Sequence, residues 1–278
     1  MNTPTAGSRV LGDTLMADGK LAPIVRWLDD NAVSAIYSSQ YWNDLEEERT
    51  KEWWIADGGE AAYARLRGYL KNSGLMEEYE LAEQFIAQLS QQDLVIADLA
   101  AGIGWTSSLL SRLPNVRAVH AVDISQHRLE LLFPAAIRMF EGRPDKLIRN
   151  LGSFYHLGFA PASMDVVFLS SAFHHAANPL RLLIEIDRVL RPGGRLILIG
   201  ENFVSAKAIL RRFAKKLLLE KRLCANFYEL FPPDDKLGDH YYRVSDYYFF
   251  NQMLGYRIVK FGVQNKHSAM VISEKATA

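Results

Sequence analysis

The stretch that most constrains the fold is residues 94–104, LVIADLAAGIG. Its first six residues are mostly apolar, which predicts a buried strand, and a turn containing Gly102 and Gly104 follows. Glycine has no Cβ and tolerates positive φ, so the backbone of such a turn can approach a ligand closely. Residues 105–113 predict a helix whose first N–H groups point at the same place. We therefore expect a strand, turn and helix with a ligand site at the end of the strand.

Two acidic residues define the kind of ligand. Asp98 lies at the end of the first strand, and Asp123 ends the next one, 19 residues after Gly104. This spacing lets a carboxylate accept hydrogen bonds from both hydroxyls of a ribose. A dinucleotide site would place a third glycine where Ser107 stands, and its pyrophosphate would be repelled by Asp98. The pattern therefore favours a nucleoside that carries positive charge.

Four stretches together resemble the class I S-adenosylmethionine-dependent methyltransferases. Residues 98–104, DLAAGIG, are similar to the family's first motif, (D/E)-x-G-x-G-x-G, with Ala100 in place of the first glycine. The other three are DIS (123–125) at the end of the second strand, SMDVVF (163–168) at the start of the fourth, and RVLRPGGRLIL (188–198) leading into the fifth. One such motif is a weak signal, whereas four in the correct order are a strong one. The resemblance covers residues 94–201.

The fold class follows from the alternation of strands and helices. Strands are expected at residues 94–99, 117–123, 146–151, 165–170 and 195–200, and a hairpin at 256–274. Strands that helices connect must pair in parallel through right-handed crossovers. We expect a Rossmann-like, open, doubly wound α/β sheet of seven strands, mostly parallel, with a C-terminal antiparallel hairpin. Residues 1–92 are expected to form a tail and a helical cap, and residues 93–278 the core, with a helical insertion at 204–244.

Composition limits the partners and the compartment. Lysine plus arginine equal aspartate plus glutamate at 32 each, so no overall field attracts nucleic acid or an anionic membrane. The single cysteine, Cys224, cannot form an intrachain disulfide, which fits a reducing cytoplasm. The N-terminus lacks the pattern of a secretory signal, and no apolar run reaches the ~20 residues that cross a bilayer. We expect a cytoplasmic protein with a small-molecule acceptor; a homodimer stays open.

The resemblance implies S-adenosylmethionine as the cofactor and S-adenosylhomocysteine as its product. It assigns Asp98 to the ammonium of the amino-acid end, directly or through one water. Ala100, Gly102 and Gly104 would supply close backbone approach, and Asp123 would bind the ribose.

Six further residues are expected to contact the cofactor, and their match to the family pattern is less regular. Ile124 would flank the adenine, and Ser170 would lie near the methionine portion. A further motif of the family usually ends in Gly-Asp, whereas here Ser153 and Phe154 follow Gly152. Ser153 would hydrogen-bond the adenine, and Phe154 would stack on it. Tyr37 and Tyr41 resemble a leading helix that covers the cofactor, although aromatic residues at helical spacing are also typical of a core.

A base for the acceptor would be a histidine, because its ordinary pKa lies near neutrality. His240, in the sequence GDHYY, is the first candidate, and the preceding Asp239 is expected to orient it; the alternative is a surface turn. His175 is the second, and its alternative is a structural role. The sequence shows neither an HxxxH pair nor a cysteine pair, so no metal is expected.

Two questions stay open. Residues 204–224 form a basic helical run, which is either a solvated outer face, the favoured interpretation, or a helix that binds a membrane surface or an acidic partner. The alternatives to a methyltransferase are a non-catalytic protein that binds S-adenosylmethionine or assists assembly, and an NAD-dependent oxidoreductase.

Overall fold

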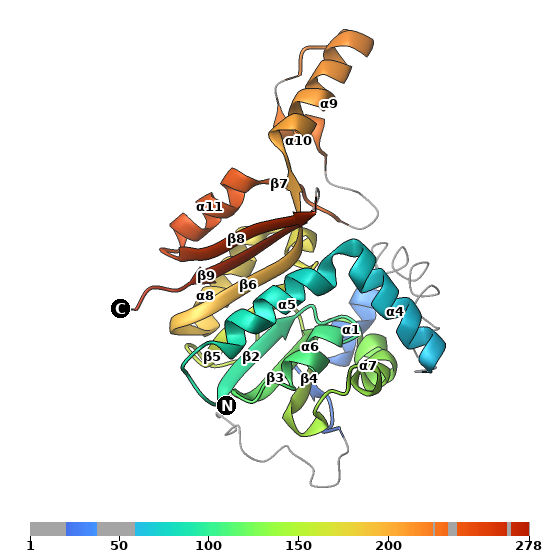
Figure 1. Ribbon diagram of the computed structural model, residues 1–278, viewed down its shortest axis with the longest axis vertical. Coiled ribbons are helices and arrows are strands. Elements are labelled where there is room, and N and C mark those ends of the chain that lie inside the picture. The colour runs from blue at the N-terminus through green and yellow to red at the C-terminus, as the bar shows by residue number, and fades with distance from the viewer. Residues whose placement is uncertain (1–20, 38–58, 225, 233–237, 266–267, 278) are drawn as a thin grey trace.

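The computed structural model describes residues 21–37, 59–224, 226–232, 238–265 and 268–277. A twisted sheet forms the centre of the molecule (Figure 1). Its described strands are β1 (Val25–Arg26), β2 (Leu94–Leu99), β3 (Val116–Asp123), β4 (Leu147–Leu151), β5 (Met164–Ser170), β6 (Leu190–Val204), β7 (Tyr242–Arg243), β8 (Arg257–Asn265) and β9 (Ser268–Glu274). Their order is β1-β4-β3-β2-β5-β6-β9-β8, and β7 pairs with β6 off this path.

The expected fold class is confirmed. All pairs are parallel except those of β9, which runs antiparallel to β6 and β8 and forms the predicted hairpin with β8. The described residues form nine strands where seven were expected, because β1 and β7 are short additional strands of two residues each.

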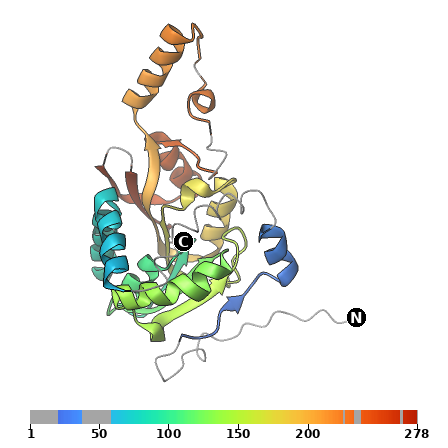
Figure 2. The ribbon, with the colours of Figure 1, turned by 90° about the vertical axis from the view of Figure 1, so that its right-hand side faces the viewer.

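Helices cover both faces of the sheet (Figure 2). The described α-helices are α1 (Asp30–Tyr37), α4 (Glu60–Ser73), α5 (Leu75–Ala87), α6 (Trp105–Leu110), α7 (Phe133–Phe140), α8 (Pro179–Val189), α9 (Ala206–Leu219), α10 (Phe227–Leu230) and α11 (Val244–Met253). Helices α4 to α7 contribute to the cluster that contains Leu94 and Ile96, whereas α8 and α11 pack with Val95 and Leu99. Successive residues of β2 therefore enter opposite cores, which explains its uninterrupted burial.

Local signals account for several helix ends. The Asn178 side chain accepts from Arg181 N at 3.0 Å and caps α8, whose first residue is Pro179. Pro134 lies in the first turn of α7, directly after a π-helical turn at Arg128–Leu132, so the helix restarts there.

The segment from Pro23 differs from the helical pattern expected for it. Val25 and Arg26 form β1, which pairs in parallel with β4 at the edge of the sheet. The next residue, Trp27, packs where Gly152 and Gly158 leave room for its ring, and meets Phe159 edge-on at 4.8 Å. This packing holds the chain in an extended form. The division at residue 92 stays a prediction.

The inserted segment leaves the body of the molecule. Strand β6 continues to Val204, and α9 and α10 then project beyond the sheet as an arm (Figure 1). Among the described helices, none combines the length and apolar character needed to cross a bilayer.

One buried histidine makes the fold sensitive to acid. His120 lies inside β3 against Phe159, and burial lowers the pKa of its imidazole to about 4. Below pH ~6.5 the unfolded chain takes up a proton that the folded chain excludes, so stability falls as pH falls.

We expect His120→Leu to remove most of this loss, which amounts to about 2 kcal/mol between pH 7 and pH 5. Urea unfolding at several pH values measures it, and the exposed His156→Leu is the matched control. An equal pH dependence in wild type and His120→Leu would contradict the assignment.

Candidate functional site

The carboxyl ends of β2 and β3 form the centre of the site. From β2 the chain continues to β3 and β4 on one side, and later returns to β5 on the other. Ligands bind at such a switch point in open α/β sheets. Backbone hydrogen bonds draw the loops together here: Ala101 N donates to Val122 O, and Gly152 N donates to Asp123 O, both at 3.0 Å.

The turn after β2 has an unusual backbone. Ala100, Gly102 and Gly104 all have positive φ, at 52°, 56° and 82°. A Cβ on Gly104 would overlap the ring of Phe133, whereas one on Gly102 would meet nothing closer than 4.0 Å. Gly104 is therefore required by packing, and Gly102 leaves open space beside the turn.

Asp98 is buried with one oxygen bound and one free. Its Oδ2 accepts from Thr106 Oγ1 at 2.7 Å and from Ser107 Oγ, both on α6. Its Oδ1 is buried and has no hydrogen-bond partner among the described residues. Burial raises the pKa of Asp98 to about 6, although the two hydroxyl donors oppose the shift. A buried oxygen without a donor is complementary to a cation or an N–H group.

Asp123 closes the turn from the neighbouring strand. Its Oδ2 accepts from Gly102 N and its Oδ1 from Ser125 N, both at 2.7 Å. Each carboxylate oxygen has a second lone pair, so both can also accept from hydroxyl groups of a ligand. Asp123 thus holds the glycine turn as well as ending the strand.

The remaining predicted cofactor residues lie around these two acids. Ile124 follows Asp123 and is half-buried. Ser153 and Phe154 follow Gly152 in the loop that bonds to Asp123; Ser153 Oγ accepts from Tyr155 N. Ser170 ends β5. Their contacts with a cofactor stay predictions.

The predicted lid is described only in part. Tyr37 is the last residue of α1. Tyr41 lies outside the described residues.

A second cluster lies after β5, around a carboxylate that the sequence analysis did not single out. Glu201 is fully buried on β6, and its oxygens accept from the backbone N–H groups of Ala172, Phe173 and His174 at 3.0 Å. His174 Nδ1 lies 2.9 Å from Oε2. Burial alone would lower the pKa of His174, but Glu201 outweighs it and raises the pKa. The sequence does carry one signal for Glu201: it is an acidic residue directly after the strand predicted at residues 195–200.

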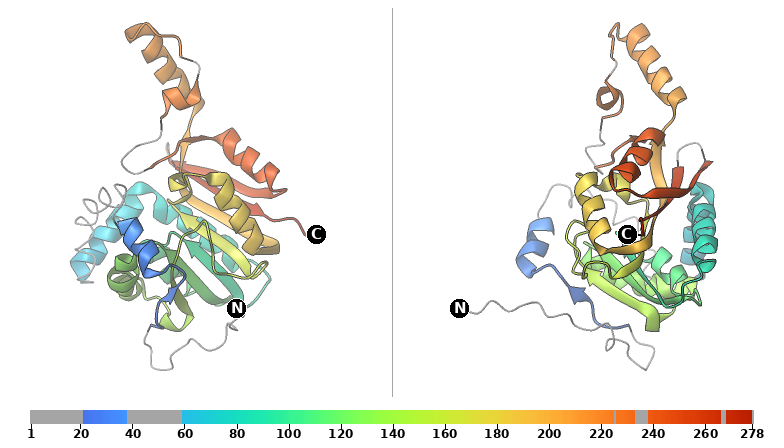
Figure 3. Two further views of the ribbon diagram at one scale, coloured as in Figure 1. Left: turned by 180° about the vertical axis from the view of Figure 1, so that it is seen from behind. Right: turned by 90° about the vertical axis from the view of Figure 1, so that its left-hand side faces the viewer.

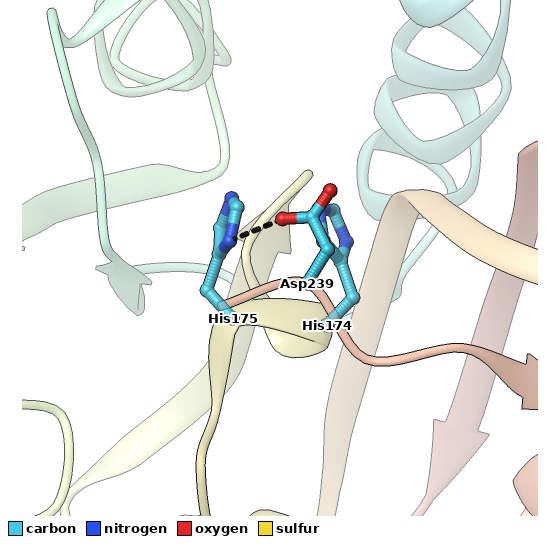
Figure 4. A group of neighbouring side chains, drawn as sticks. All are labelled: His174, His175 and Asp239. Atoms are coloured by element: carbon cyan, nitrogen blue, oxygen red, sulfur yellow. Dashed lines mark ion pairs between the residues drawn. The ribbon is translucent and has the colours of Figure 1, made fainter. Parts of the chain in front are cut away.

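His175 and Asp239 form an ion pair in the same cluster. His175 Nδ1 lies 2.9 Å from Asp239 Oδ1, and this bond lowers the pKa of Asp239 (Figure 4). The expectation that Asp239 orients His240 is therefore wrong, because the carboxylate pairs with His175. One donor atom each of His174, His175 and Asp239 lies within 4.8 Å of the others, and such a set could hold a divalent cation. No local pattern in the sequence indicates this set, since Asp239 lies 64 positions after His175.

His240 lies beside this cluster and in the wall of a cavity. Its backbone N donates to His174 O at 2.7 Å. The cavity has a volume of about 710 Å³. Aromatic rings line much of it: Phe231 at the end of α10, Tyr241 and Tyr242 at β7, and Phe250 on α11. Burial lowers the pKa of His240, although Asp239 opposes the shift. The ring is therefore neutral at pH 7 and able to accept a proton.

Comparisons with known proteins agree with this architecture. Residues 97–198 match the methyltransferase domain family. The chain is 33% identical over 104 residues to dimethylglycine N-methyltransferase of Parasynechococcus marenigrum, covering 36% of this chain and 34% of that protein. It is 29% identical over 169 residues to malonyl-[acyl-carrier protein] O-methyltransferase of Hahella chejuensis, covering 59% and 56%.

A solved S-adenosylmethionine-dependent methyltransferase of Methanosarcina mazei has the same fold, with a TM-score of 0.52 at 19% identity over 70% of this chain and 98% of that one. The chain spans about a third and just over half of the lengths of the two curated relatives. For residues 97–198, the resemblance predicted from the motifs is confirmed.

The two glycines of the turn should respond differently to substitution. Gly104→Ala combines positive φ with overlap on Phe133, so we expect a loss of ~3 kcal/mol or more in unfolding free energy. Gly102→Ala should cost only the backbone strain, about 1–2 kcal/mol. Denaturant unfolding of both variants measures the difference, and equal losses would contradict the packing assigned to Gly104.

Proposed function

We propose that this chain, whose residues 97–198 form a class I methyltransferase domain, transfers a methyl group from S-adenosylmethionine to a small organic acceptor. The observation that carries the proposal is Asp98, a buried strand-end carboxylate with a free oxygen beside a left-handed glycine turn. The family match favours this function over an NAD-dependent oxidoreductase.

The residues present fit the cofactor. Asp98 Oδ1 would accept from the ammonium group, because a buried oxygen without a donor is stabilised by a cation. Asp123 would bind the ribose hydroxyls through its remaining lone pairs, and the open side of Gly102 leaves room for the ligand. When bound, S-adenosylmethionine supplies an electrophilic methyl carbon that an acceptor displaces in line.

The aromatic cavity is the proposed acceptor site. Its rings exclude water from an organic acceptor, and Asn178, Ser245 and Asp246 add polar groups at its wall. The two curated relatives are named for N- and O-methylation, so the domain as such is compatible with more than one acceptor atom.

The protein's contribution to the chemistry is positioning and proton removal. A hydroxyl acceptor must lose its proton during or after transfer. His240 is the proposed base, since it lines the cavity and its pKa is lowered. Glu201 and the backbone N–H groups that it accepts from fix the turn containing His174 and His175, and His174 O fixes the backbone of His240.

Asp98→Asn tests the cofactor site. The substitution keeps the shape of the side chain and removes its charge, so affinity for S-adenosylmethionine should fall by about 1.5–3 kcal/mol. Wild-type affinity should also weaken as pH falls through about 6, where Asp98 takes up a proton, and the variant should lack this dependence. Titration calorimetry at several pH values measures both effects.

The exposed Asp145→Asn is the control and should bind as wild type does. Unchanged affinity in a well-folded Asp98→Asn protein would remove Asp98 from the site and undermine the proposed function. Tight binding without turnover on any acceptor of a metabolite library would instead favour the non-catalytic alternative.

His240→Gln tests the base. With a hydroxyl acceptor we expect kcat to fall about 10²–10⁴-fold, while affinity for S-adenosylmethionine stays unchanged. His175→Gln should first lower stability, because Asp239 loses its partner. The exposed His156→Gln serves as control. Wild-type kcat in His240→Gln at saturating hydroxyl acceptor would exclude it as the base.

A further inference from the structure

The arm carries apolar side chains that the protein itself leaves uncovered. No residue of α9 is buried. Leu218, Leu219 and Leu223 are 74%, 73% and 77% exposed, and Leu217 is 42% exposed. These four residues, the tip leucines, lie at the far end of α9 and just after it. Their side chains point to several sides of the helix axis, so this end of the arm forms an apolar patch around its tip. Clustered exposed leucines on a soluble domain mark a surface that binds something.

Several cations along the same segment have no acidic partner among the described residues. Lys207, Arg211, Lys215 and Lys221 form no ion pair with any residue that the structure describes. Glu220 is the one acidic residue in the sequence from 206 to 224, and it lies 3.9 Å from Lys216.

The other three cations of the segment are already engaged. Arg212 donates to Leu230 O and stacks on Phe231, Arg222 pairs with Glu229, and Lys216 lies between Glu220 and Glu229. The division is informative, because one set of cations builds the arm and the other set faces outward.

The position of the patch decides between possible occupants. Helix α9 has 14 residues, which corresponds to about 21 Å, and the views in Figure 1 and Figure 3 show it projecting away from the sheet. A second copy of the arm would bring the same positive charge into contact with this one. A narrow end also offers a protein partner little area. A flat anionic surface attracts the positive charge of the arm and needs only the small contact area that its end provides.

We propose that the arm docks on an anionic lipid surface. The tip leucines enter the boundary between headgroups and acyl chains, and Arg211, Lys215 and Lys221, the cations nearest the tip, contact the phosphates. Lys207, in the first turn of α9, adds to the attraction at longer range. This is interfacial binding by the end of an amphipathic basic helix, and it does not depend on the methyl-transfer proposal.

Vesicle sedimentation of the full chain tests the proposal. We expect binding to vesicles of phosphatidylcholine mixed with phosphatidylglycerol, no binding to phosphatidylcholine alone, and weakening at about 0.5 M salt. The double substitution Leu218→Glu/Leu219→Glu should abolish binding. Arg211→Gln/Lys215→Gln should weaken it about fivefold for each charge removed.

Ile184→Glu is the matched control, because Ile184 is 65% exposed but lies on α8 in the body. It should bind vesicles as wild type does, and thermal unfolding should show that all variants fold. Absence of binding to the anionic vesicles, equal binding to both compositions, or equal loss in Ile184→Glu would overturn the proposal. Dimerisation that the Leu218→Glu/Leu219→Glu variant abolishes, without vesicle binding, would show a second copy as the occupant instead.

Discussion

The hydrogen bonds to the buried carboxylate of Glu201 are the interactions on which the turn after β5 and the neighbouring His240 depend. It is fully buried, and a buried charge is tolerated only when hydrogen bonds and an opposite charge compensate it. Three backbone N–H groups and the ring of His174 supply that compensation. The turn after β5 therefore has one conformation, and His175 and His240 are placed through it.

The same principle operates at two other strand ends, with one significant difference. Asp123 accepts from backbone groups with both oxygens, so it closes its turn completely. Asp98 accepts with one oxygen only and keeps the other buried and free. An unsatisfied oxygen lowers the stability of the chain alone. Such a group is expected where a ligand supplies the missing donor, so we place the cofactor's cationic end at Asp98 and not at Glu201.

Sequence reasoning was successful where a signal lay within one short stretch. The buried strand at residues 94–99, the glycine turn, the cap at Asn178 and the hairpin are all local patterns. It failed where a contact joins distant residues. Strand β1 has two residues and exists because Trp27 finds room beside Gly152 and Gly158. His175 pairs with Asp239 only because the chain returns to the sheet after the arm. The helical pattern of residues 206–219 predicts a helix, but it does not show whether another part of the protein covers its leucines.

The arm also connects the two proposed sites through a small cluster of its own. Val204, Cys224, Leu230 and Phe231 form a core separate from the two that flank the sheet, and Arg212 stacks on Phe231. Phe231 and Tyr228 line the aromatic cavity, whereas the tip leucines lie at the other end of the same segment. A substitution at the tip alters only a surface. A substitution in this small core alters the position of α10, so it changes the cavity wall as well. The arm is thus one structural unit whose base lines the proposed acceptor site and whose end carries the proposed lipid contact.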